Sequence, residues 1–275
     1  MTTKMPGSPS DEDAERTRPS QDTGASRSSA LLQPVTEDAR RLARSLLRSS
    51  REAALGVIRP SDGFPSVSRT LVATDFAGRP IILISGLSLH AKALKVDRRC
   101  SMLVGRSGKG DPLAHPRMTV FAVAEPLALD GDEGLMVRAR FLARHPKAEL
   151  YVDFPDFQFL RLEPTGASLN GGFARAYDLS PVDLIDGGHD DLPALAERAR
   201  VHMNADHQDA IDTLATLKGY DGNGWLIATV DRRGFEIARS DQLERIEFGM
   251  DPGDDGGYRK AFVELMRPDE GKGGS

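Results

Sequence analysis

The segment from residue 79 to residue 123 constrains the fold most, because short apolar runs alternate in it with residues that end regular structure. Ile81–Ile84 and Cys100–Val104 are short, largely β-branched or apolar runs, typical of buried strands. Ser88 is placed to cap a short helix between them. Gly105–Pro116 contains three glycines and two prolines, which predicts a loop, and Arg117–Val123 predicts a third strand. A loop with basic side chains and free backbone N–H groups can receive an anion, although a plain solvated loop has the same composition.

Around this segment the pattern is one of hairpins with few helices, which favours a barrel over a parallel sheet. An acidic start and an apolar face predict a helix at Thr36–Ser49, and a second helix is expected at Asp132–His145. The imidazole of His145 is most simply read as a positive charge at the carboxyl end of that second helix. Further strands are expected at Ala53–Ile58, Phe64–Ala73, Phe157–Leu162 and Gly166–Leu169, with Phe173–Leu179 closing the barrel.

After residue 179 the pattern changes from strands to helix. An apolar stripe predicts one helix from Leu192 to about Leu217, followed by three short strands and a last helix. The expected organisation is therefore a disordered tail at 1–35, whose polar composition cannot drive folding, a barrel at 36–179, a linker at 180–191 and a small α-β-β-β-α domain at 192–268. The fold class is α+β.

Composition excludes several classes of function. The chain has 275 residues, a net charge of −5 and no basic excess, which argues against nucleic acid as a partner. Its one cysteine, Cys100, lies in a strand run, where a core position is expected, and one cysteine cannot form an intramolecular disulfide. No apolar stretch approaches the roughly 20 residues of a membrane span, and the start of the chain lacks a signal-peptide core. We therefore expect a cytoplasmic protein with no membrane association.

Several motifs carry a family resemblance. I-L-I-S-G-L-S-L-H-A-K-A-L at 82–94, followed by D-R-R-C-S-M-L at 97–103, resembles the FMN-binding split barrel of the pyridoxamine-phosphate-oxidase superfamily. G-D-P-L-A-H-P-R-M-T-V at 110–120, D-F-Q-F-L-R-L at 156–162 and N-G-G-F-A-R-A-Y at 170–177 resemble its haem-utilisation branch, the HugZ/HutZ family. V-H-M-N-A-D-H-Q-D-A-I at 201–211 is similar to the H-M-N-x-D-H signature of a small (DUF2470-type) domain that often follows this barrel.

The resemblance to the superfamily implies a flavin mononucleotide site at the interface of a homodimer. Its phosphate would meet the cations and hydroxyls that match the family positions, because a dianion needs fixed cations and hydroxyl donors. The matching positions are Arg69, Ser85, Ser88 and Lys92. His90 stands where flavin members often carry an arginine, and a histidine is a poorer partner for phosphate.

The resemblance to the haem branch implies haem in the same cleft. The family's iron-ligating histidine follows the G-G-F-G strand, and His189 is the only histidine of the matching segment. Asp156 stands at the position of the aspartate that supports this ligand, and Arg117 could face a propionate or bound oxygen. Ala174 replaces the last glycine of G-G-F-G, and His189 also reads as a hydrophilic linker residue. His115 is an alternative ligand, or the cap of a strand start.

His202 and His207 lie five residues apart, which is about 140° around a continuous helix. On that geometry they cannot bind one metal ion from the same face, so a polar interface between the domains is the simpler reading. His202 and Asp206 are an i,i+4 pair.

The function expected from the resemblance is haem binding with oxygenase-type haem degradation. The alternatives are an FMN-dependent oxidoreductase and a non-catalytic regulator of tetrapyrrole metabolism that acts through a protein partner. In the first two cases the protein is an oxidoreductase.

Overall fold

The structure is a computed structural model that describes residues 1, 32–105, 108–172, 175–187, 191–254 and 257–267. Residues 33–275 form one compact unit. Most of the tail expected at 1–35 lies outside the described residues. At its end, Gln33 N donates to Ala176 O at 2.9 Å and Val35 packs against the barrel core, so residues 33–35 belong to the folded body and not to the tail.

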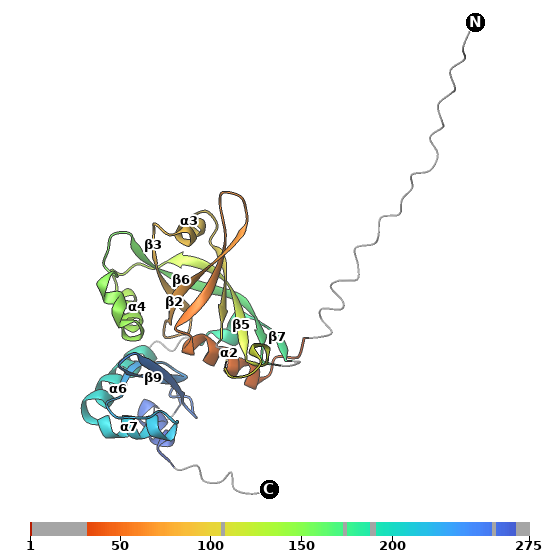
Figure 1. Ribbon diagram of the computed structural model, residues 1–275. Coiled ribbons are helices and arrows are strands. Elements are labelled where there is room, and N and C mark those ends of the chain that lie inside the picture. The colour runs from red at the N-terminus through yellow and green to blue at the C-terminus, as the bar shows by residue number, and fades with distance from the viewer. Residues whose placement is uncertain (2–31, 106–107, 173–174, 188–190, 255–256, 268–275) are drawn as a thin grey trace. The chain divides into compact units, whose positions relative to one another are not determined.

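Six strands close into a barrel (Figure 1). The order is β3-β2-β1-β4-β5-β6, and β3 also pairs with β6, which closes the ring. The barrel strands are β1 (Glu52–Ile58), β2 (Pro65–Thr74), β3 (Pro80–Ser85), β4 (Arg99–Val104), β5 (Arg117–Pro126) and β6 (Phe157–Asn170). The split barrel expected from the sequence is therefore confirmed.

Two expected features of the last strands are wrong. The two short strands expected on either side of Pro164 are one strand, β6, because a bulge opposite Phe121 and Ala122 of β5 accommodates the proline within the ladder. β7 (Ala176–Leu179) pairs only with β6, so it extends the sheet and does not close the barrel. The closing contact comes instead from β3 and β6, which are far apart in the sequence.

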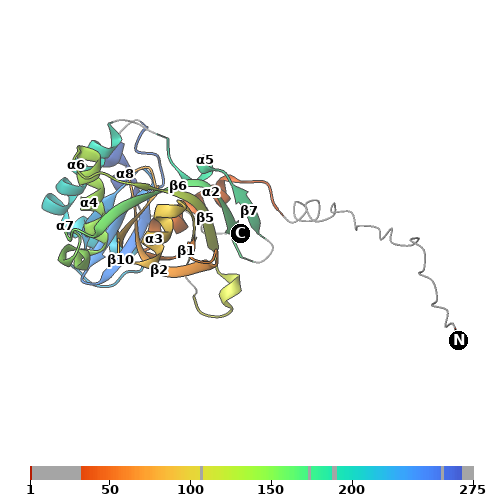
Figure 2. The ribbon, with the colours of Figure 1, turned by 90° about the horizontal axis from the view of Figure 1, so that it is seen from above.

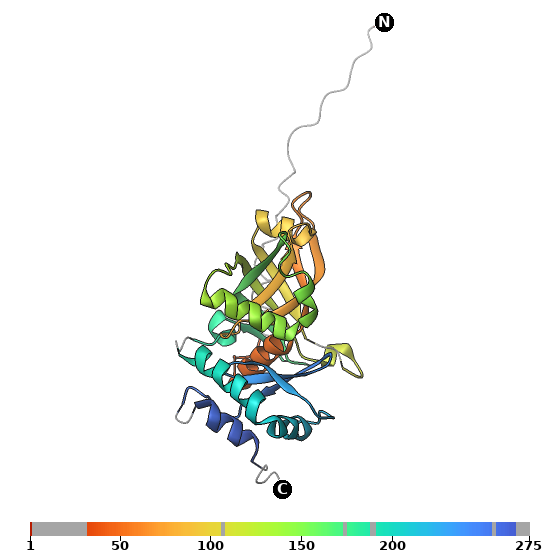
Figure 3. The same cartoon turned by 90° about the vertical axis from the view of Figure 1, so that its left-hand side faces the viewer.

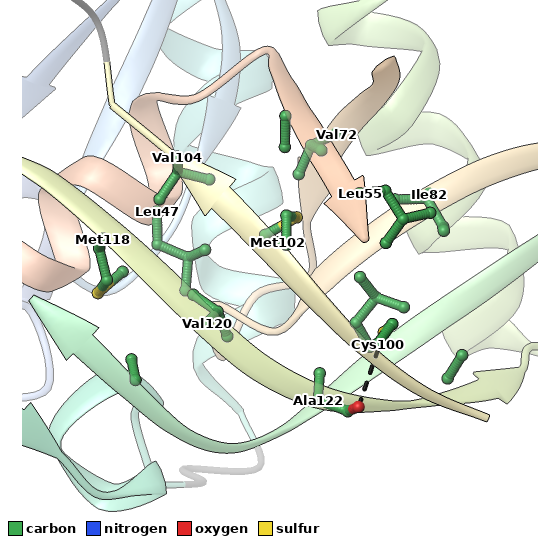
Figure 4. Close-up of a cluster of buried hydrophobic side chains, with 14 of the residues drawn as sticks. Leu47, Leu55, Val72, Ile82, Cys100, Met102, Val104, Met118, Val120 and Ala122 are labelled. Carbon is green, nitrogen blue, oxygen red and sulfur yellow. Dashed lines mark hydrogen bonds between the residues drawn. The ribbon is translucent and has the colours of Figure 1, made fainter. Parts of the chain in front are cut away.

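Helix α2 (Glu37–Ser49) supplies part of the barrel core. Thr36 caps it, accepting from Ala39 N at 3.2 Å, and its apolar face is buried. Figure 4 shows Leu47 among the side chains of β4 and β5, and the thiol of Cys100 pointing at Ala122 O, 3.7 Å away. Burial raises the pKa of Cys100 to about 12. Its expected role as a core residue is confirmed.

Two more helices cover the barrel. The cap predicted for α3 (Leu89–Val96) is present, because Ser88 Oγ accepts from Ala91 N at 3.2 Å. Figure 2 looks along the barrel and shows α3 at its near end. α4 (Asp132–Arg144) lies across the outside of the strands (Figure 3), where Val137 and Phe141 pack on Ile81 and Phe159. A short 3-10 turn, η2 (Pro146–Leu150), follows α4.

The remaining chain forms a second layer with its own apolar cluster, centred on Trp225 and Phe235. A short helix, α5 (Pro181–Leu184), precedes it. The three-stranded antiparallel sheet has the order β10-β9-β8. The elements are α6 (Leu192–Asp206), α7 (Gln208–Leu217), β8 (Leu226–Val230), β9 (Gly234–Arg239), β10 (Gln242–Glu247) and α8 (Gly257–Leu265).

The single helix expected from Leu192 to Leu217 is wrong. It is broken at His207, whose backbone is not helical (φ −135°, ψ 39°) and which both ends α6 and starts α7. Ala210 N and Ile211 N donate to His207 O, each at 3.1 Å, so the second helix starts afresh. The acidic residue Asp209 in the first turn of α7 is the local signal for this new start.

Buried ion pairs tie the barrel to this second layer. The guanidinium of Arg144, at the end of α4, pairs with Glu236 of β9 and donates to Arg48 O at 2.7 Å and Ser50 O at 2.6 Å. Arg48 of α2 pairs with Asp186 at 2.7 Å. These side chains are excluded from solvent, so water does not stabilise their charges. Each charge is stabilised by its ion-pair partner instead. None of the helices within the described ranges is long and apolar enough to cross a membrane.

Candidate functional site

A cleft of about 950 Å³ opens on the barrel wall beside β1, β2 and β4. Its volume is in the range that holds a cofactor-sized ligand. Its lining includes two cations, Arg51 and Arg69, and one carboxylate, Glu52. The rest of the lining is a mixture of polar and apolar residues. The apolar side chains that line it are Ala53, Ala54, Val67, Leu71 and Leu103.

The strand register explains why these side chains share one face. Arg69 of β2 lies opposite Ala54 of β1, which lies opposite Leu103 of β4. Side chains directly opposite each other in adjacent strands point to the same face of a sheet. Arg69 and Leu103 are exposed. The row therefore places a cation beside small and apolar side chains on the outer face of the barrel.

The two arginines differ in how firmly they are held. Arg51 donates to Asp241 O at 2.8 Å and to Arg144 O at 3.2 Å, which are neutral carbonyls, and among the described residues it forms no ion pair. Arg69 is exposed and its Nη1 lies 3.5 Å from Glu52 Oε2, a weak surface pair. Both guanidinium groups are therefore able to hold an incoming carboxylate or phosphate.

His145 also lines the cleft, and its expected role is wrong. It is 5% exposed and its Nε2–H donates to Val72 O at 2.9 Å. Burial lowers the pKa of His145 to about 4, with neighbouring arginine charges adding to the effect. A neutral imidazole carries no charge at the helix end, so His145 does not act on the dipole of α4. Its proton is fixed on Nε2 by the carbonyl, which leaves Nδ1 as the unprotonated ring nitrogen.

The other residues expected at the cofactor lie at the end of the barrel near α3. Ser85 Oγ donates to Asp156 Oδ2 at 2.5 Å, and Ser88 Oγ donates to Ser85 O at 2.8 Å. His90 Nδ1 is hydrogen-bonded to Ser68 Oγ at 3.0 Å, and burial lowers the pKa of His90. Lys92 is exposed. The structure thus brings Ser85, Ser88 and Asp156 together, while Arg69 projects from the outer face.

Arg117 and Asp156 are not brought together within one chain. Arg117 pairs with Asn170 at one end of β6, and Asp156 immediately precedes its other end. At about 3.3 Å per residue, the two ends are about 40 Å apart along the strand. Arg117 Nη1 donates to Leu113 O at 3.1 Å and so braces the loop before β5.

Of the two histidines expected as iron ligands, His115 and His189, the structure describes only His115. His115 Nε2–H donates to Lys109 O at 3.0 Å within the same loop as Arg117. His189 lies outside the described residues.

Sequence reasoning missed Arg51 and His145 as residues of the cleft. Arg51 follows α2 directly, and its basic charge just before a strand is a weak local signal. Nothing near His145 indicates that it meets β2, because Val72 is 73 residues away in the sequence.

A closed barrel whose wall carries a cleft with two arginines and several apolar side chains defines a split-barrel protein with a site suited to an anionic, partly apolar molecule. Residues 34–183 match the family described as CREG, beta-barrel. This is more than half of the chain, and the chain therefore belongs to the CREG β-barrel family.

Similar proteins extend this picture. A structure from Agrobacterium tumefaciens, of a protein of unknown function, is 32% identical and covers 85% of this chain and 98% of its own, with a TM-score of 0.72. The structure of a heme binding protein from Mycobacterium smegmatis is 26% identical and covers 85% of this chain and 97% of its own, with a TM-score of 0.51.

Curated relatives are also found. The chloroplastic non-canonical heme oxygenase HOZ of Arabidopsis thaliana is 30% identical over 183 residues, which are 64% of this chain and 55% of that protein. The chain thus spans about half the length of this relative. Heme oxygenase HutZ of Vibrio cholerae is 29% identical over 132 residues, 47% of this chain and 74% of that protein.

Proposed function

We propose that this chain binds haem in the cleft on the barrel wall and degrades it by an oxygenase-type reaction. The observation that carries the proposal is the cleft itself, which combines two arginines with a row of apolar side chains, in a chain similar over most of its length to a heme binding protein. Two curated relatives are named heme oxygenases, which supports the same activity.

The residues of the cleft fit the chemistry of haem. Haem is a flat apolar macrocycle with two carboxylates at one edge, so it needs apolar walls and a few cations. Ala54, Val67 and Leu103 would supply apolar surface, and Arg51 and Arg69 would hold the propionates by charge-assisted hydrogen bonds. When bound, haem supplies the iron at which dioxygen is activated.

We propose His189 as the iron ligand, because in the resembling family the ligand histidine follows the last barrel strand. Arg117 would act on bound oxygen, and Asp156 would support the ligand. Because Arg117 and Asp156 lie at opposite ends of β6, they can serve one site only if they come from different chains. The proposal for these roles therefore depends on a homodimer.

A second copy of the chain is the partner that we propose for the outer face of β1, β2, β4 and β5. Val67, Gly56, Ser101 and Phe121 form one row across these strands. Val67 is 69% exposed and Phe121 47%, while Gly56 and Ser101 let another surface approach closely. An exposed apolar row of this kind is typical of a protein interface, and it continues directly from the cleft through Arg69 and Leu103.

The barrel end near α3 disfavours flavin mononucleotide. Asp156 lies within 2.5 Å of Ser85 Oγ, so a carboxylate stands where the phosphate of a flavin would be expected. Two negative charges so close repel each other. In addition, Ser88 Oγ is already used to cap α3. Haem avoids this conflict because its propionates would lie at Arg51 and Arg69.

We also propose the division of the chain at 36–179, 180–191 and 192–268, and the assignment of the last part to the H-M-N-x-D-H type of domain. Separate apolar clusters in the barrel and around Trp225 support this division.

Titration of the full chain with hemin tests the function. We expect a Soret band that saturates at one haem per chain, and its loss in the presence of reductant and oxygen with the appearance of bilin absorbance. A yellow flavin spectrum as isolated, without hemin binding, would favour the FMN-dependent alternative. Binding of neither cofactor would favour the regulatory alternative and overturn the proposal.

A further inference from the structure

A groove of about 530 Å³ opens on the second layer, lined by residues of α6, α7 and α8. Figure 3 shows α8, in dark blue, beside α6. The groove shares no residue with the cleft on the barrel wall, and its volume is in the range of small-molecule sites. The function proposed for the barrel leaves this groove without a role.

The floor of the groove is apolar. Leu214 and Phe262 are buried in it, and Met203 is 9% exposed. Val263 and Met266 continue the apolar surface outward and are exposed. Each helix contributes two lining residues four positions apart, which share one helix face. The pairs are Ala199 and Met203, Ala210 and Leu214, and Phe262 and Met266.

Every charged side chain in the lining is a cation, because Arg198 of α6 and Arg259 of α8 line the groove and no carboxylate does. Among the described residues, these two arginines form no hydrogen bond or ion pair. Two other arginines, Arg200 of α6 and Arg267 just after α8, are paired with glutamates on the outside of the groove. The groove therefore combines an apolar floor with two unpaired guanidinium groups.

His202 and His207 also line the groove, but their rings are already paired. In a continuous helix they would point about 140° apart. The break at His207 instead brings their Nε2 atoms to 3.2 Å, and Nδ1 of His202 is hydrogen-bonded to Asp206 Oδ2 at 2.9 Å. The separation expected from a continuous helix is therefore wrong. Arg198 and Arg259 remain as the cations of the lining that have no partner among the described residues.

The charge of the lining decides what kind of molecule fits the groove. An occupant has to supply an apolar body and a negative charge. Residues 268–275, P-D-E-G-K-G-G-S, contain no large apolar side chain, so this segment cannot cover the apolar floor. The planar fork of an arginine matches the oxygen atoms of a carboxylate or a phosphate.

We propose that this groove binds a single-chain amphiphile with an oxyanion head group, either a carboxylate or a phosphate monoester. Arg198 and Arg259 hold the head group by charge-assisted hydrogen bonds. The alkyl chain packs on Met203, Phe262 and Met266, and the unbranched methionine side chains adapt to a flexible ligand. The site is separate from the barrel cleft and does not depend on haem.

Isothermal titration of the full chain with laurate, below its critical micelle concentration, tests the proposal. We expect one laurate per chain. Arg198→Ala and Arg259→Ala should each weaken binding about tenfold or more, because each loses a charge-assisted hydrogen bond. Both arginines are exposed, so the variants should keep the wild-type circular dichroism spectrum and melting temperature. Arg267→Ala is the matched control and should bind laurate as the wild type does.

The head group and the floor are tested separately. Dodecanol has the same alkyl chain without the charge and should bind at least about tenfold more weakly than laurate. Dodecyl phosphate, titrated in parallel, shows which of the two oxyanions the arginines prefer. Ala210→Phe fills the groove and should abolish binding, whereas Ala205→Phe, at an exposed position outside the lining, should not.

Three results would overturn the proposal. The first is equal affinity of the wild type and the Arg198→Ala/Arg259→Ala double variant for laurate, which includes no binding by either. The second is equal affinity of the wild type for laurate and dodecanol. The third is loss of laurate binding in Arg69→Ala, which would place the ligand in the barrel cleft instead.

Discussion

Arg48 Nη2 lies 2.7 Å from Asp186 Oδ2, and both side chains are almost completely buried, at 0% and 2% exposure. Arg48 belongs to α2 of the barrel, and Asp186 also binds Arg233 of the second layer at 2.5 Å. Burial lowers the pKa of Arg48, while the carboxylates of Asp231 and Asp186 oppose the shift. The pair therefore depends on mutual compensation, since neither charge has water to replace a lost partner.

Loss of the Arg48–Asp186 ion pair should strongly destabilise the folded protein. Asp186→Asn is expected to lower the free energy of unfolding by about 3–5 kcal/mol, because the buried guanidinium of Arg48 loses a carboxylate partner. Asp62→Asn, which breaks the exposed Arg59–Asp62 pair, should cost at most about 1 kcal/mol. Urea denaturation of the two variants measures both values, and a similar small loss for both would show that the buried pair is not needed.

The depressed pKa of His145 should make stability depend on pH. Below its ordinary value of 6.5 the unfolded chain takes up a proton, whereas the folded chain resists protonation until about pH 4. The free energy of unfolding should therefore fall as the pH is lowered from 6.5 to 4, by about 3 kcal/mol in total, with no contribution above pH 6.5.

His145→Gln should remove this part of the pH dependence, because an amide can still donate to Val72 O but does not titrate. Denaturation at a series of pH values should give a flatter profile for this variant. Parallel profiles for wild type and His145→Gln would contradict the assignment.

Arg69 should contribute to haem affinity. Loss of one charge-assisted hydrogen bond costs about 1.5–3 kcal/mol, so Arg69→Ala should weaken hemin binding roughly 10- to 100-fold. Arg99→Ala is the control, since Arg99 is an exposed arginine paired with Asp97 on the same sheet and outside the cleft. Equal affinities of the two variants in a Soret titration would remove Arg69 from the site.

The proposed dimer predicts a specific loss of assembly. Phe121→Glu places a charge in the exposed apolar row and should convert the dimer to a monomer in light scattering at micromolar protein. Leu150→Glu, at a more exposed apolar position in η2 (79% against 47% for Phe121), should remain dimeric. A monomeric wild type would refute the dimer outright.

His189→Ala should weaken hemin binding and move the Soret maximum, while His115→Ala should change the spectrum less, because the imidazole of His115 is held by Lys109 O. Arg117→Ala should keep haem but slow its degradation. An unchanged spectrum in the His189 variant would remove it as ligand, and His145, whose Nδ1 is unprotonated beside the cleft, would be the next histidine to replace.

The local elements of this protein are determined by the sequence alone. The cap at Ser88, the acidic start of α2 and the short apolar runs at residues 81–84 and 100–104 predicted helices and strands where the structure has them. These signals suffice because capping, helix dipole and side-chain periodicity depend on residues within one or two turns of each other. The order of hairpins was enough to favour a barrel.

Tertiary structure decided how distant parts meet. The sequence does not show that β3 pairs with β6, that His145 is buried against Val72, or that Arg51 and Arg69 border one cleft, because each depends on strands brought together only by barrel closure. The same holds for His202 and His207. Their rings meet because Asn204 and Gln208 are tied to the backbone of residues 225–227, and this tertiary contact overrides the continuous helix that the apolar stripe favours.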